Sequence, residues 1–131
     1  MPHLIRRQVK QLVSEGKSPD VLINLTNDGW FWGSSILDMH FHCAVFRAVE
    51  NRRPVLIAAN TGISGWIDAS GKVVARAERR RAASIVASIS PSRHETVYTQ
   101  LGDLGLIAVA FIALVAGSCF ARYRASGSVS R

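Results

Sequence analysis

Apolar residues recur with the period of a helix in two parts of the first hundred residues. Between residues 3 and 15, apolar side chains alternate with basic and polar ones at the spacing of one helical face, and Gly16 ends the pattern. Residues 37–49 follow the same period, and Pro54 stops the helix that they begin. We therefore predict two amphipathic helices.

Short apolar runs beside these helices have the length and composition of buried strands. They occupy residues 20–25, 55–59 and 84–90. Residues 64–68 and 72–76 flank an Ala-Ser-Gly turn and predict a hairpin. The order helix, strand, helix, strand, hairpin, strand indicates an α/β fold with a largely buried sheet.

The strongest apolar segment lies near the C-terminus. Residues 104–121 contain no charge, and Arg122 and Arg124 follow directly. As a helix this segment would extend about 27 Å, close to the hydrocarbon thickness of a bilayer. A transmembrane helix is favoured over a buried core helix. The chain is thus divided into a domain at 1–100, a transmembrane helix at 104–121 and a basic, disordered tail at 122–131.

The chain is basic, with a formal net charge of +7 that is concentrated in short arginine runs. No recognition motif accompanies these runs and few aromatic residues lie beside them, so no nucleic-acid partner is expected. Solvated faces and anionic lipid headgroups account for the charge. Two cysteines are too few for a disulfide scaffold.

Three stretches in fixed order resemble one family. They are Leu-Thr-Asn-Asp-Gly-Trp-Phe at 25–31, a helix at 40–54 with Phe-Arg-Ala-Val-Glu and Arg-Arg-Pro, and Ala-Asn-Thr-Gly-Ile-Ser at 59–64. Their order and spacing resemble the last third of the nitrilase (carbon-nitrogen hydrolase) domain of apolipoprotein N-acyltransferases, over about residues 3–122. The resemblance implies the C-terminal part of a nitrilase-type α-β-β-α sandwich, followed by one transmembrane helix.

The resemblance also implies a reaction. An acyl chain moves from a phospholipid to a cysteine thiolate, and then to the α-amine of a lipoprotein's diacylglyceryl-cysteine. A Glu-Lys-Cys triad supplies the base, the oxyanion stabiliser and the nucleophile. In the family all three lie upstream of the matching region. No catalytic residue, metal or other cofactor is therefore expected in this chain, and we predict that it is inactive alone.

The family pattern marks one loop as a substrate-contact candidate, formed by Asn27, Asp28, Trp30 and Phe31. Large apolar rings suit an active-site mouth that meets acyl chains or the membrane interface. The alternative is a plain turn, with Trp30 capping the core. An inserted Trp32 departs from the commoner Trp-Phe-Gly pattern, so the loop geometry of the family is not transferred in detail.

Four further residues are candidates for bracing the active site. Arg47 and Glu50 stand three residues apart on one helix face, which permits a salt bridge, and bracing is favoured over substrate contact. Asn60 and Gly62 are expected to shape a tight turn near the catalytic centre, with glycine permitting a positive φ.

Cys43 is the remaining candidate nucleophile. It shares a helix face with His40 and Arg47, which could lower a thiol pKa. No base or oxyanion partner accompanies it, so we expect a small buried hydrophobe instead. His40 and His42 point to different faces of the helix and do not form a metal site with Cys43.

The expected location depends on what precedes the chain. The family implies the bacterial inner membrane, with the domain in the periplasm, one C-terminal span, and phospholipid and lipoprotein as substrates. The N-terminus has no apolar signal-peptide segment, which leaves undecided the side of the membrane on which the domain lies.

We interpret the chain as part of a truncated reading frame that lacks its N-terminal portion. The alternatives are a fragment of a hydrolase of small amides, or a non-catalytic, membrane-anchored remnant that pairs with a paralogue.

Overall fold

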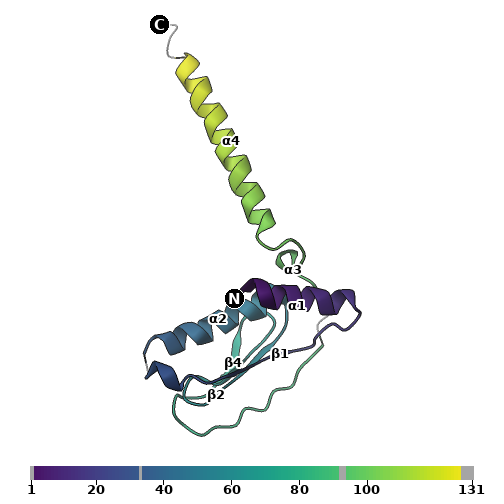
Figure 1. Cartoon of the computed structure of the whole chain (residues 1–131), viewed down its shortest axis with the longest axis vertical. Helices are drawn as coiled ribbons and strands as arrows, with labels where there is room; N and C mark the ends of the chain where they lie inside the picture. Colours follow the sequence, from purple (N-terminus) through teal and green to yellow (C-terminus); the bar gives the residue numbers. More distant parts are fainter. Residues whose placement is uncertain (1, 33, 92–93, 128–131) are drawn as a thin grey trace. The chain divides into compact units, whose positions relative to one another are not determined.

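A four-stranded sheet with the order β1-β2-β3-β4 organises the first unit of the chain, Met1–Gln100 (Figure 1). The computed structural model describes residues 2–32, 34–91 and 94–127. The strands are β1 (Leu22–Thr26), β2 (Val55–Ala59), β3 (Gly65–Ile67) and β4 (Val73–Arg76). β1 and β2 are parallel, whereas β2, β3 and β4 are successively antiparallel. The predicted α/β class, the strand at 55–59 and the hairpin are confirmed.

The helices of this unit lie on one side of the sheet. They are α1 (Pro2–Ser14) and α2 (Ile36–Asn51), with a 3-10 turn η1 (Gly29–Phe31) between β1 and α2. α1 contacts α2, and α2 contacts β2 and β3 (Figure 1). Parallel strands need a crossover connection, and α2 provides the one between β1 and β2. Both predicted amphipathic helices are confirmed.

The core lies between α2 and the sheet. It consists of apolar side chains from α2, β2, β3 and the loop between these strands: Phe41, Ala44, Ala48, Val55, Ile57, Ile63 and Ile67. Paired residues on adjacent strands face the same side, so the Leu22↔Val55 pairing turns Leu22 towards α2. Ile23 and Leu25 face the opposite side and are 65% and 77% exposed. Leu22 is therefore partly buried beneath α2, whereas the face of β1 that carries Ile23 and Leu25 is open.

The strand predicted at residues 84–90 is wrong. These residues have no regular secondary structure and pair with no strand of the sheet. Val86, the apolar centre of the run, is 92% exposed. A strand is stabilised by a hydrogen-bonded neighbour, and the described part of the chain offers none to this run.

The second unit, Leu101–Arg131, contains α4 (Leu104–Gly127), and α3 (Val97–Leu101) reaches its boundary. α4 covers the predicted apolar segment and continues to residue 127. The helix thus includes the first residues of the segment that the sequence predicts as a tail. The structure does not describe residues 128–131 or the side chains of residues 119 and 121–127. Within the described residues, no helix has the length and hydropathy needed to cross a bilayer. The helix at 104–121 is confirmed, and its passage through a membrane stays a prediction.

Candidate functional site

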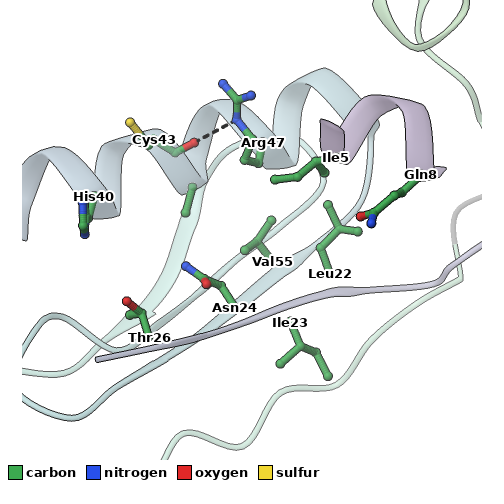
Figure 2. Close-up of a pocket in the computed structure, with 11 residues that line it drawn as sticks. Ile5, Gln8, Leu22, Ile23, Asn24, Thr26, His40, Cys43, Arg47 and Val55 are labelled. Carbon is green, nitrogen blue, oxygen red and sulfur yellow. Dashed lines mark hydrogen bonds between the residues drawn. The ribbon is translucent and has the colours of Figure 1, made fainter. Parts of the chain in front are cut away.

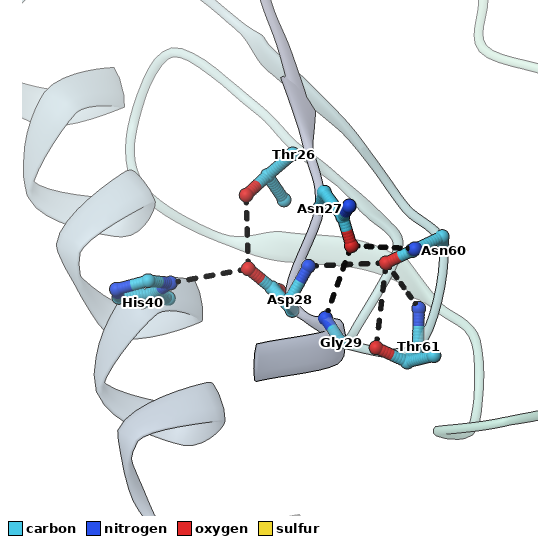
Figure 3. Close-up of polar contacts among 7 residues, drawn as sticks. All are labelled: Thr26, Asn27, Asp28, Gly29, His40, Asn60 and Thr61. Carbon is cyan, nitrogen blue, oxygen red and sulfur yellow. Dashed lines mark hydrogen bonds and ion pairs between the residues drawn. The ribbon is translucent and has the colours of Figure 1, made fainter. Parts of the chain in front are cut away.

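The loops that follow β1 and β2 are joined by the side chain of Asn60 (Figure 3). Its Oδ1 accepts the backbone N–H of Asp28 at 3.0 Å, and its Nδ2 donates to Oδ1 of Asn27 at 2.7 Å. Because β1 and β2 are parallel neighbours, the loops at their carboxyl ends meet at the same edge of the sheet, where open α/β sheets commonly bind ligands. The structure therefore brings the predicted Asn27-Asp28 loop and Asn60 together.

The carboxylate of Asp28 is buried in this junction, with 3% of the residue exposed. Its Oδ1 accepts the hydroxyl of Thr26 at 2.9 Å and lies 3.3 Å from Nδ1 of His40 on α2 (Figure 3). The His40 ring in turn meets Phe31 edge-to-face, with 5.1 Å between ring centroids. A buried carboxylate needs such partners. Asp28 thus ties the β1 loop to α2 as well as to the β2 loop.

Gly62 is required by close packing against Asp28. A Cβ atom at this position would stand 2.0 Å from Oδ2 of Asp28 and 2.9 Å from its Cγ. The positive φ expected for Gly62 is wrong, since Gly62 is not among the left-handed glycines of the described chain. The glycine allows the buried carboxylate to lie directly over the backbone of the turn.

Two tryptophans of the same loop project into solvent. Trp30 is 81% exposed and Trp32 is 88% exposed, so the interpretation that Trp30 caps the core is wrong. Trp32 has a left-handed backbone with φ of 44°, which is unusual for a bulky residue. The predicted departure from the family's loop pattern at Trp32 is therefore located at a strained backbone position.

Arg47 and Glu50 form the predicted salt bridge on α2. Nη1 of Arg47 lies 2.9 Å from Oε2 of Glu50, and Nη2 donates to Oε1 at 3.0 Å. Both side chains are largely buried, at 17% and 23% exposed, so solvent ions screen this ion pair less than a surface pair. Their role in bracing an active site stays a prediction.

A pocket of about 540 Å³ lies between α1, β1 and α2 (Figure 2). Apolar and polar residues line it: Ile5, Gln8, Leu22, Ile23, Asn24, Thr26, His40, Cys43, Ala44, Arg47 and Val55. Thr26 and His40 belong to both the pocket and the Asp28 junction. The pocket thus adjoins the joined loops.

Cys43 lies on the wall of this pocket as an exposed, free thiol, so the prediction of a buried position is wrong. Its sulfur and the His40 ring point in different directions (Figure 2). His40 interacts with Asp28, and Arg47 pairs with Glu50. Nε of Arg47 also donates to the backbone oxygen of Cys43, 3.4 Å away. The geometry does not place a base at this thiol.

The sequence profile described as carbon-nitrogen hydrolase matches residues 11–98, which include both joined loops, most of the pocket and all of α2. The chain belongs to the carbon-nitrogen hydrolase family.

Curated relatives within this family carry the name apolipoprotein N-acyltransferase. The protein from Haemophilus influenzae is 36% identical over 117 residues, which are 89% of this chain and 22% of the relative. The protein from Rhodopirellula baltica is 40% identical over 87 residues, which are 66% of this chain and 15% of the relative. The protein from Thermotoga maritima is 43% identical over 84 residues, which are 64% of this chain and 17% of the relative. The chain therefore spans about a fifth of the length of these relatives.

One residue that supports the site in this carbon-nitrogen hydrolase chain was missed. Arg53 is 1% exposed, and its guanidinium donates to the backbone oxygen of His94 at 2.9 Å and to Oγ of Ser18 at 2.8 Å. Burial lowers the pKa of Arg53, and the charges of Asp20 and Glu95 oppose that shift. Arg53 immediately precedes Pro54 and β2, so it anchors the start of the strand that Asn60 follows. The sequence shows only an arginine pair, which indicates a solvated face.

Proposed function

We propose that this chain is the C-terminal part of an apolipoprotein N-acyltransferase. Such an enzyme moves an acyl chain from phospholipid to the N-terminal diacylglyceryl-cysteine of lipoproteins through a thioester. The observation that carries the proposal is the Asn60-centred junction of two loops, which lies inside the region matched by the family and beside a pocket. The names of the similar proteins support the same activity.

In this proposal the chain supplies support and substrate contacts, while the nucleophile, base and lysine come from sequence outside it. The two loops are held in one arrangement by Asp28, His40 and Asn60. They therefore form a fixed side of the active site, against which the reacting groups are positioned. Glu50 pairs with the charge of Arg47, which lines the pocket. Trp30 projects from the loop and is free to contact an acyl chain.

The proposal includes membrane attachment at the bacterial inner membrane through α4. Its support is the uncharged sequence at 104–121 and the apolar surface that α4 presents on all sides within its own unit. A helix that is apolar all round is stable when lipid or protein covers it. Alkaline carbonate extraction of membranes tests this part: a chain recovered in the soluble fraction contradicts it.

The activity is tested with a chimaera in which residues 11–98 replace the matching segment of the Haemophilus influenzae relative. We expect the chimaera to sustain lipoprotein N-acylation in cells depleted of their own enzyme. Asn60→Ala in this chimaera should lower N-acylation about a hundredfold, because small displacements of an active-site wall have effects of that size. Lys72→Ala, on the exposed hairpin, is the matched control and should leave N-acylation unchanged.

Two results would contradict the proposal. One is a chimaera that is present in membranes at normal abundance and inactive. The other is an acylated cysteine, found by mass spectrometry, on the isolated chain incubated with phospholipid. Ammonia release from small amides by the chimaera would favour the small-amide hydrolase. Saturable binding to an intact paralogue, without turnover, would favour the non-catalytic remnant.

A further inference from the structure

The chain between β4 and α4 contains an irregular part and a bonded part. Residues 77–91 form no helix or strand, and their side chains are half-buried or exposed. Residues 94–100, which include most of α3, make hydrogen bonds to α1 and to the C-terminal end of α2. We call residues 94–100 the clasp.

Two threonines of the clasp bind the same backbone oxygen at the end of α2. The hydroxyl of Thr96 donates to the carbonyl oxygen of Glu50 at 2.5 Å, and the hydroxyl of Thr99 donates to the same oxygen at 3.2 Å. The last carbonyl groups of a helix lack partners within the helix, and these hydroxyls supply one. Thr99 is 1% exposed. Arg53, just after α2, holds the start of the clasp through the backbone oxygen of His94.

Two basic side chains of α1 bind the other end of the clasp. Nη1 of Arg6 donates to the backbone oxygen of Thr99 at 3.3 Å, and its guanidinium lies 5.9 Å from the centre of the Tyr98 ring. Nζ of Lys10 donates to the backbone oxygen of Gln100 at 3.0 Å. A helix as short as α3 is not stable by itself, so these contacts hold it in place.

The clasp ends where the division between the two units falls. The first unit ends at Gln100 and the second begins at Leu101. Gly102 has a left-handed backbone with φ of 59°. The N–H of Ile107 donates to the backbone oxygen of Asp103 at 3.0 Å, where α4 begins. Residues 101–103 therefore connect the clasp to α4.

We propose that the clasp fixes the chain to the first unit as far as Gln100, and confines movement between the two units to residues 101–103. Three extended residues span about 10 Å, whereas the whole stretch from 77 to 103 would span about 90 Å if nothing held it. The clasp thus turns a long connection into a short hinge. The inference goes beyond the proposed function, because it holds whichever reaction the chain supports.

Distances between spin labels test the hinge on the full chain in detergent, by double electron–electron resonance. The exposed thiol of Cys43 carries one label, and Cys119→Ser removes the other cysteine. The second label is attached after either Gln100→Cys or Leu106→Cys, both at exposed positions. We expect a narrow distance distribution to residue 100, because both labels then belong to the first unit. The distribution to residue 106 should be broader by up to about 10 Å, the span of the hinge.

Removing the threonine hydroxyls should open the clasp. Thr96→Val with Thr99→Val keeps the shape of both side chains, and the distribution from Cys43 to residue 100 should become as broad as the one to residue 106. Circular dichroism checks that the variant stays folded. If it does not fold, Lys10→Met removes an exposed donor of the clasp and should broaden the same distribution.

A matched control removes two hydroxyls from the loop before the clasp. Ser88→Ala with Ser90→Ala changes two exposed residues and should leave the distribution from Cys43 to residue 100 narrow.

Three results would overturn the proposal. Equally broad distributions to residues 100 and 106 in the natural chain would mean that the clasp is open. Equally narrow ones would mean that residues 101–103 are rigid. A folded threonine variant that keeps the narrow distribution, or broadens no more than the serine control, would mean that the hydroxyls do not hold the clasp. The measurement uses no substrate, so its outcome is independent of N-acylation by the chimaera.

Discussion

Arg52 and Arg53 are neighbours of the same residue type with opposite environments. Arg52 ends α2 in the left-handed conformation, with φ of 50°. Arg53 is buried and bonds Ser18 and His94, which are 35 and 41 positions away. A pattern of local residue types cannot distinguish the two, because the difference arises from contacts that only the folded chain creates.

Replacing Arg53 should lower the free energy of unfolding, whereas replacing Arg52 by glycine should raise it. Arg53→Ala leaves the carbonyl of His94 and the hydroxyl of Ser18 without their buried donor, and should lower the free energy of unfolding by about 3 kcal/mol. Arg52→Gly should raise it by up to about 1 kcal/mol, because glycine adopts the left-handed helix cap without strain. Urea denaturation of the full chain in mild detergent, followed by circular dichroism, measures both. Equal effects of the two substitutions would contradict the assigned environments.

Gly62→Ala should disrupt the junction of the two loops. The new methyl group would overlap the Asp28 carboxylate, and overpacking of this kind should cost about 2 kcal/mol. Asp28 would move away from Thr26 and His40, so N-acylation by the chimaera should fall together with its melting temperature. Lys72→Ala, on the exposed hairpin, is again the control and should change neither melting nor activity. A variant of Gly62 with unchanged melting and activity would show that the carboxylate can relocate freely.

The sequence predicted part of this site. The resemblance to the family marked Asn27, Asp28 and Asn60, and the parallel pairing of β1 with β2 brings their loops to one edge. The role of His40 as the partner of Asp28 was not predicted, because it depends on how α2 is rotated against β1. The contact that requires Gly62 was missed for a related reason: φ is a local property, whereas the Asp28 carboxylate comes from a loop more than thirty residues earlier.

Helices and strands were predicted correctly where a segment had both the periodicity of the element and a neighbouring element to pack against. α2 has a helical period and a sheet to bury it, and β2 lies between two strands that pair with it. The run at 84–90 has similar strand-like residues and no neighbour. Strand propensity depends on such neighbours more than helix propensity does. The composition of a run therefore cannot decide whether it becomes a strand.

The hairpin of β3 and β4 should lose stability in acid. Burial opposes ionisation of Asp68, but hydrogen bonds from the hydroxyl and N–H of Ser70 and the N–H of Lys72 outweigh it, and the pKa of Asp68 is lowered. A carboxyl whose pKa is lower in the folded state stabilises the fold at neutral pH. This contribution decreases as pH falls below the ordinary value of 3.8 and through the folded-state pKa.

Asp68→Asn tests that assignment. The amide keeps one acceptor but loses the charge, so the variant should be about 1 kcal/mol less stable at neutral pH. Its stability should also fall less steeply than that of the natural chain between neutral and acidic pH. Asp103→Asn, outside the first unit, is the control. If the stabilities of the natural chain and of the Asp68 variant fell in parallel with pH, Asp68 would be excluded as the cause of the acid sensitivity.

At the scale of the whole molecule, the first unit has an incomplete sheet. β1 pairs with β2 on one side, and in the described residues no strand pairs with its other edge. Ile23 and Leu25 add two exposed apolar side chains to that edge strand. Exposed, unprotected edge strands of this kind pair with other chains and promote aggregation. The family's longer members are proposed to cover this edge with sequence outside the present chain.

A fragment of residues 1–100 should therefore aggregate through β1, even without α4. Ile23→Lys with Leu25→Lys places charges on the exposed face of the edge strand and should slow aggregation, as lysine does on natural edge strands. Val86→Lys replaces an even more exposed apolar residue that belongs to no strand, and should have little effect. Light scattering at matched concentration gives the three rates. A natural fragment that is monodisperse and melts cooperatively would show that β1 is protected as it stands, and would remove the structural reason for expecting a missing portion beside it.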